Sequence, residues 1–199
     1  MEKQLIISVG REFGSGGHEI AEKLAEKFSL KLYDKNLLQH IAEERNVDSR
    51  HFEKYDEAPR NLLFSRTVKG LSNSMEENVA NMQFNYLKKK AQEGESFVVV
   101  GRCSETILKD YPGLVSIFVL GDKVHKIERV MRLYNMSEEE AELYIYRQDR
   151  KRKGYHNYYC KGKWGDSRNY DISVNSSKLG EDVTVDILVD YILKRQNQQ

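Results

Sequence analysis

Short apolar runs alternate along the chain with stretches in which apolar residues recur at helical spacing. Each run ends at glycine, aspartate or another polar residue and has the length of a strand that is buried on both faces. Strands separated by helices are typical of a parallel sheet with helices on both faces and right-handed crossovers, so the pattern predicts an α/β fold. The five predicted strands are residues 5–9, 30–33, 97–100, 114–120 and 170–174.

The stretches between these runs predict helices. Ile20, Leu24 and Phe28 recur at every fourth position and define one apolar face. Ser137 and Glu140 have the spacing of a capping box, which predicts that a helix begins there and continues into a basic segment. Further helices are expected around residues 37–42, 107–108 and 183–191.

Residues 48–95 show no strand signal, and their apolar positions predict two or three helices. A length of 199 residues fits one domain, residues 1–199, with a helical insertion at about 45–95. The apolar face of the helical stretch at 60–92 can be buried internally or against a second subunit, which leaves a homodimer open.

The composition, 39% hydrophobic and 32% charged, indicates a folded globular protein. No apolar run approaches the roughly 20 residues that span a bilayer, and the first residues do not resemble a signal peptide. We therefore expect a cytoplasmic protein with no membrane contact. Cys103 and Cys160 are too few for a disulfide framework or a cysteine-rich metal site.

Charge is balanced overall, at +1, but unevenly distributed. Between Arg147 and Arg168 lie eight Lys and Arg residues against Asp149 and Asp166, a local excess of six positive charges. A basic segment in an otherwise mildly acidic chain suits an anionic ligand, whether phosphate, nucleotide or nucleic acid.

A glycine-rich turn joins the first predicted strand to the first predicted helix. Such a turn can direct several backbone N–H groups at a phosphate, and the helix adds its positive N-terminal end. The pattern is an imperfect P-loop, because Gly17 stands where the motif has its lysine. Arg11 and His18 are local candidates for the missing charge. The expected phosphate-binding residues are Arg11, Gly14, Ser15, Gly16, Gly17 and His18.

Further short motifs follow the other predicted strands in a characteristic order. Together with the glycine-rich turn they resemble the cytidylate kinase-like family, within the P-loop nucleoside monophosphate kinases. The resemblance implies a three-layer P-loop kinase fold with a five-stranded parallel sheet and a helical lid. It also implies ATP with Mg²⁺, and phosphoryl transfer to a nucleoside monophosphate such as CMP or to another small acceptor. The motifs are Arg11 to Gly17, Tyr33-Asp34-Lys35, Gly101-Arg102, Asp149 to Arg152, Trp164-Gly165-Asp166 and Asn169-Tyr170-Asp171.

Two residues at strand ends are expected to share a crevice with the turn, since ligands of open α/β sheets bind beyond the carboxyl ends of the strands. Arg102 resembles the acceptor-binding arginine of cytidylate kinases, although Cys103 replaces the aspartate that follows it there. An arginine in this place can instead belong to a structural ion pair. Asp34 can orient a magnesium-bound water or the acceptor, or it can cap the next helix.

The basic segment, about residues 144–169, is similar to the lid of nucleotide kinases. On one helix Arg147, Arg150 and Lys151 share a face, and such a cluster can replace the missing lysine. The resemblance makes Arg147 and Arg150 catalytic candidates beside Asp34 and Arg102. The alternative is a solvated basic helix end.

Two other functions compete with an ATP-dependent kinase. The first is a degenerate member that binds a nucleotide or phosphate without catalysis, which Gly17 favours. The second is a nucleic-acid binder that uses the basic, aromatic stretch at 144–170. We expect nucleotide substrates rather than nucleic acid, because the rest of the chain would repel a polyanion.

Overall fold

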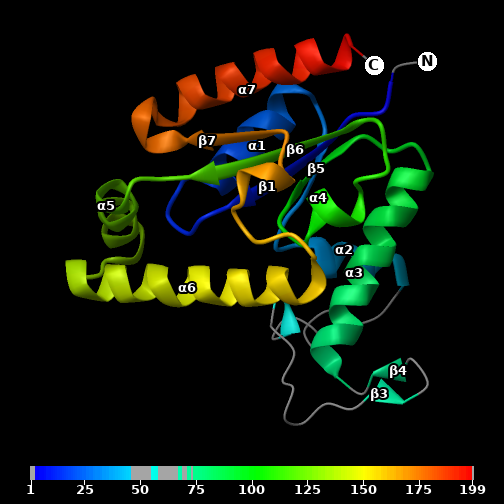
Figure 1. The fold of residues 1–199 in the computed structure, drawn as a ribbon, viewed down its shortest axis with the longest axis horizontal. Helices are drawn as coiled ribbons and strands as arrows, with labels where there is room; N and C mark the ends of the chain where they lie inside the picture. The colour runs from blue at the N-terminus through cyan, green and yellow to red at the C-terminus, as the bar shows by residue number, and fades with distance from the viewer. Residues whose placement is uncertain (1–2, 46–54, 58–66, 69–70, 73, 199) are drawn as a thin grey trace.

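The computed structural model describes residues 3–45, 55–57, 67–68, 71–72 and 74–198 (Figure 1). Five strands form one parallel sheet in the order β2-β5-β1-β6-β7, which confirms the predicted sheet. The strands are β1 (Ile6–Arg11), β2 (Lys31–Tyr33), β5 (Phe97–Val100), β6 (Leu114–Leu120) and β7 (Ile172–Asn175).

Helices cover both faces of the sheet and make three layers, as predicted. On one face, the inward residues of α1 and α7 pack against Ile7, Val98 and Ile117. On the other face, α2 and α3 pack against Ile6 and Phe97. Alternate residues of each buried strand therefore enter opposite cores, which is why the strands are apolar at nearly every position. These helices are α1 (Gly17–Lys27), α2 (Leu37–Arg45), α3 (Met75–Gln92) and α7 (Gly180–Gln196).

The central strand β1 lies between β5 and β6, so the strand order reverses beside it. Because all five strands are parallel, the turns that follow β1, β2 and β5 leave the same edge of the sheet. Arg11, Asp34 and Arg102 lie in these three turns or at their start. The fold thus brings the expected crevice residues to one edge, at the point where α/β sheets bind their ligands.

Two further helices lie beyond this edge. α6 (Glu138–Tyr159) begins with the predicted capping box: Ser137 Oγ accepts from the Glu140 amide at 3.3 Å, and Glu140 Oε2 accepts from the Ser137 amide at 2.8 Å. α5 (Lys123–Tyr134) is not among the elements expected above, and it packs against α6 through Ile127 and Val130. In Figure 1, α7 runs along the top of the molecule and α6 along its lower side.

The expectation that residues 48–95 contain no strand was wrong. β3 (Thr67–Val68) and β4 (Leu71–Ser72) pair as a two-stranded antiparallel sheet. Strands of two residues leave no alternation to detect, so the sequence pattern could not reveal them. α3 is one of the helices expected there, and the remainder of that segment lies outside the described residues.

Three short elements complete the described structure: α4 (Ser104–Ile107) and the 3-10 helices η3 (Ser167–Asn169) and η4 (Ser176–Lys178). Within the ranges given above, every helix is too short or too polar to cross a bilayer.

Candidate functional site

The turn between β1 and α1 has the backbone shape of an anion cradle. Gly14 and Gly16 have φ angles of 80° and 74°, in the left-handed region that favours glycine. The amides of Gly14, Gly16, Gly17 and His18 donate to no acceptor in the described part of the chain. These groups lie at the N-terminus of α1, where an anion is stabilised by the free amides and by the helix dipole.

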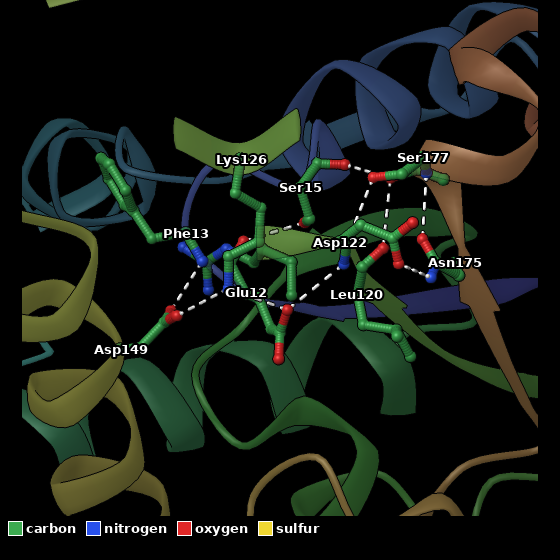
Figure 2. A network of polar contacts seen from close by, with 12 residues as sticks. Glu12, Phe13, Ser15, Leu120, Asp122, Lys126, Asp149, Asn175 and Ser177 are labelled. Atoms are coloured by element: carbon green, nitrogen blue, oxygen red, sulfur yellow. Dashed lines mark hydrogen bonds and ion pairs between the residues drawn. The ribbon is translucent and has the colours of Figure 1, made fainter. Parts of the chain in front are cut away.

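Two other amides of the same turn are already used (Figure 2). The Phe13 amide donates to Asp149 Oδ1 of α6 at 2.6 Å, and the Ser15 amide donates to the Glu12 carbonyl at 3.4 Å. Lys126 of α5 bridges Glu12 Oε2 at 2.9 Å and Asp149 Oδ2 at 3.1 Å. Both helices beyond the sheet edge are therefore fastened to the turn by buried or half-buried charges.

The packing around Gly17 leaves no room for a side chain. A Cβ atom at position 17 would lie 2.5 Å from Cβ of Arg11, closer than side-chain carbons approach, and 3.2 Å from Cβ of Val119, a tight contact. The space that a side chain at position 17 would need is thus filled by Arg11, the last residue of β1. The guanidinium of Arg11 points toward the same crevice, so the cation next to the cradle comes from the strand rather than from the helix.

The crevice beside the turn is a hollow of about 310 Å³, which we call the arginine pocket. Its charged lining is balanced, with five basic and five acidic side chains. The interactions of the buried members, such as Arg102 and Asp34, are strengthened because little water screens them. The basic residues are Arg11, Lys35, Arg102, Arg129 and Arg152, and the acidic ones are Glu12, Glu19, Asp34, Asp56 and Glu57.

Three of these arginines surround Glu57. Arg11 Nη1 lies 3.3 Å and Arg102 Nη1 3.4 Å from Glu57 Oε1. Burial alone would raise the pKa of Glu57, but the charges of Arg11, Arg102 and Arg152 outweigh it and hold that pKa far below its usual range. Arg102 also binds Asp56 Oδ2 at 2.7 Å, and its pKa is raised by Glu57 and Asp56 despite burial. Arg102 is thus a buried ion-pair member that also lines the pocket.

Arg152 enters the pocket from α6. Its Nη1 donates to the Arg11 carbonyl at 3.3 Å, and its guanidinium lies 5.2 Å from the centre of the Phe13 ring. Burial, together with the neighbouring charge of Arg11, lowers the pKa of Arg152 to about 10. Arg152 remains charged at neutral pH, and it has fewer carboxylate partners than Arg102.

Asp34 caps the turn before α2 and also lines the arginine pocket. Its Oδ1 accepts from the Asn36 amide at 2.9 Å, which fixes the turn before α2. Its Oδ2 lies 3.6 Å from His18 Nε2 and belongs to the pocket lining. One oxygen of this buried carboxylate is therefore free of backbone partners.

A second hollow, of about 530 Å³, lies on the other side of the turn, and we call it the serine pocket because Ser15, Ser176 and Ser177 line it. Gly14 and Arg129 line both pockets, so the two hollows meet at the glycine-rich turn. Arg129 binds Glu19 at 2.6 Å and also pairs with Glu181 of α7.

Arg147 and Arg150 do not reach either pocket. Both are exposed and line a surface hollow on α6 together with Lys151 and Lys153. The structure therefore brings together Arg11, Gly14, Gly16, Gly17, His18, Asp34 and Arg102 around the arginine pocket, and it places Ser15 in the serine pocket.

The sequence reasoning missed several residues of the site: Arg152, Arg129, Asp56 and Glu57. A signal for Arg152 exists, because Ala141, Ile145, Asp149, Arg152 and His156 follow one another at intervals of three or four residues and form one helix stripe. Asp56 and Glu57 pair with Arg102, which lies more than 40 residues away, and no local pattern indicates such a pair.

Replacing Glu57 by glutamine tests the electrostatics of the arginine pocket. We expect the variant to lose about 3 kcal/mol of unfolding free energy at neutral pH, because the arginines lose a shared partner. A carboxylate whose pKa is lower in the folded state stabilises the protein at pH values above its pKa in the unfolded state, about 4.3. The difference in unfolding free energy between the variant and wild type should therefore shrink as the pH falls below that value. Urea unfolding at several pH values measures this.

The exposed residue Glu139 supplies the control, as Glu139→Gln should change stability little. Glu57→Gln should also gain more thermal stability from inorganic phosphate than wild type does, since phosphate no longer competes with a carboxylate. An equal gain in both proteins would contradict this account of the pocket.

The parallel sheet with a glycine-rich turn after its central strand places the chain among proteins of the P-loop kinase fold. A shikimate kinase from Bacteroides thetaiotaomicron shares this fold, with a TM-score of 0.56, 14% identity and coverage of 94% of this chain and 98% of its own. A gluconokinase from Sinorhizobium meliloti 1021 superposes with a TM-score of 0.50, 12% identity and coverage of 100% and 94%. Identities this low show the shared fold alone.

The chain belongs to the Cytidylate kinase-like family, whose model matches residues 6–178. An uncharacterized protein from Eubacterium ventriosum ATCC 27560 is 41% identical, with a TM-score of 0.76 and coverage of 95% of this chain and 98% of its own. A search of curated proteins gave no match.

Proposed function

We propose that the protein transfers the terminal phosphoryl group of ATP to a small acceptor, with a nucleoside monophosphate such as CMP as the leading candidate. The observation that carries this proposal is that two pockets meet at the glycine-rich turn, where Gly14 and Arg129 line both. A donor in the serine pocket and an acceptor in the arginine pocket would bring their phosphates together over the free amides. Such positioning supplies much of the catalysis of phosphoryl transfer.

Arg11 and Arg152 are proposed to supply the charge that a loop lysine supplies elsewhere. Both guanidinium groups border the cradle, and Arg152 is carried by the helix that corresponds to the proposed lid at 144–169. Arginine can donate to two phosphate oxygens at once, so it suits charge that spreads over a transferring group. Movement of α6 would bring Arg152 to that group and exclude water.

Asp34 is the residue that best fits the magnesium ion of ATP. Hard divalent cations prefer carboxylate oxygens, and Asp34 keeps one oxygen that no backbone group uses. His18 occupies the position of the usual loop hydroxyl, and the next residue, Glu19, is already neutralised by Arg129. The ion would supply neutralisation of phosphate charge, while Arg11, Arg102 and His18 hold and orient the anionic groups.

The test is ADP formation from ATP and Mg²⁺ with a panel of acceptors: CMP, UMP, AMP, shikimate and gluconate. We expect at least one acceptor to raise ADP formation well above that with ATP alone. Gly16→Val should abolish both this activity and the thermal stabilisation by ATP. Its Cβ would enter a left-handed position 2.9 Å from Glu181 Oε1 and crowd the approach to the phosphate.

Gly154→Val is the matched control, because Gly154 lies on the exposed side of α6 and lines neither pocket. It should bind ATP as wild type does. Unchanged stabilisation of a folded Gly16→Val by ATP would reject the turn as the binding site.

A degenerate nucleotide-binding protein is the second candidate, and two observations favour it. Arg11 leaves no room for a lysine at position 17, and the charges of the arginine pocket already neutralise one another. Tight ATP binding without ADP formation across the whole panel would support this candidate over the kinase.

A further inference from the structure

Three potential metal ligands, Glu105, His156 and Cys160, meet behind the arginine pocket, and Cys103 lines the small hollow beside them. Cys103 and Glu105 lie in the turn after β5 and in α4, and His156 and Cys160 lie at the end of α6. His156 Nε2 is 2.8 Å and Cys160 Sγ is 3.8 Å from Glu105 Oε1, and ligand atoms of these three residues all lie within 4.8 Å of one another. Cys103 lies in the same buried cluster as Cys160.

The cluster is closed to solvent. The side chains of Glu105 and His156 are 3% and 6% exposed, and both cysteines are buried. Phe84 and Tyr155 pack against the cysteines as part of one apolar cluster. Ligand groups as buried as these are typical of structural zinc sites, whereas catalytic sites keep one position open for water or substrate.

The spacing of the ligand atoms agrees with zinc. At bond lengths of about 2.0–2.3 Å, tetrahedral ligands lie roughly 3.3–3.8 Å apart. The contact between Cys160 and Glu105 already has this length, and the contact between His156 and Glu105 needs to widen by about half an ångström. A small hollow of about 20 Å³, enough for one small particle, is lined by Cys103, Glu105 and His156, with Arg11, Arg102 and Arg152 on its other side.

The charges agree as well. Two thiolates, one carboxylate and a neutral imidazole around Zn²⁺ leave one net negative charge. Arg152, which has fewer carboxylate partners than Arg102, lines the same small hollow and would compensate this charge.

We propose that Cys103, Glu105, His156 and Cys160 form a structural zinc site that joins the C-terminal end of α6 to the turn after β5. Both joined segments carry an arginine of the pocket: Arg102 precedes Cys103, and Arg152 lies one helical turn before His156. The ion would therefore fix the positions of the two arginines relative to each other. The two cysteines are 57 positions apart, which is why their number and spacing argued against a cysteine-rich metal site.

Zinc content of the full-length protein tests this directly. The protein is stripped with a chelator under reducing conditions, reloaded with zinc, desalted and analysed by mass spectrometry of the metal. We expect roughly one zinc ion per chain and a rise in Tm on reloading. Cobalt(II) in place of zinc should give the intense thiolate-to-metal absorption of a tetrahedral site.

Variants then assign the ligands. Cys160→Ser and His156→Ala should each lose the bound zinc, and Cys103→Ser should weaken the thiolate absorption of the cobalt form. His125→Ala, an exposed histidine of α5, should keep full loading. Zinc-free wild-type protein after reloading, or a disulfide between the two cysteines in the reduced preparation, would overturn the proposal even if the variants do not fold. Phosphoryl transfer is not part of this measurement, so the two proposals fail independently.

Discussion

Replacing Arg152 by alanine is expected to lower the turnover of phosphoryl transfer by roughly 10²–10³-fold, with little change in ATP affinity. Arg152 reaches the arginine pocket from α6 and lies beside Arg11 next to the free amides. A cation that acts mainly on the charge developing in the transition state affects kcat more than ground-state binding. Steady-state kinetics with the best acceptor, together with ATP titration by calorimetry, separates the two quantities.

Arg150→Ala is the matched comparison. Arg150 is exposed and two positions from Arg152, so the two side chains point in opposite directions from the helix, about 200° apart. We expect Arg150→Ala to retain most of the activity. If Arg150→Ala instead lost more activity than Arg152→Ala, α6 would have to rotate during the reaction. Arg147 and Arg150 would then be the cations that contact the transferred phosphoryl group.

Replacing Gly17 by alanine is expected to lower the unfolding free energy by about 1–3 kcal/mol. The added carbon would lie 2.5 Å from Cβ of Arg11, which is close to the backbone and cannot move aside without shifting β1. Gly17→Lys should cost more and should not create a working P-loop lysine. Urea unfolding followed by circular dichroism gives the difference.

Gly154→Ala is the control for this experiment, and it should be neutral or stabilising by up to about 1 kcal/mol because alanine is the better helix former. A Gly17→Ala protein as stable as wild type would show that Arg11 does not fill the lysine's space. Activity gained by Gly17→Lys would lead to the same conclusion.

The strands could be predicted because both faces of the sheet are covered. Residues such as Val98 and Val99 enter opposite cores, so the run is apolar throughout and stands out from its surroundings. Parallel strands then place the turns after them at one edge, which is why Asp34 and Arg102 could be expected beside the glycine-rich turn. These inferences need only local sequence and one rule of topology.

The inward face of α6 could not be read so directly. Polar residues outnumber apolar ones in α6. Its inward face includes His156 and Arg152 and is not continuously apolar. Asp56 and Glu57 contact Arg102, which is distant from them in the sequence, and only the folded chain brings these residues together. The sequence therefore located the pocket but did not show which arginine points into it.

The equal numbers of basic and acidic side chains in the arginine pocket affect the rate at which a ligand binds. A site with as many acidic as basic side chains projects little field into solvent, so an approaching nucleotide gains almost no electrostatic steering. Recognition then depends on short-range contacts. The ligand must replace Asp56 and Glu57 as the acceptor of hydrogen bonds from the arginines. Association rates in such a pocket respond weakly to ionic strength, and small anions that satisfy only one arginine are poor competitors.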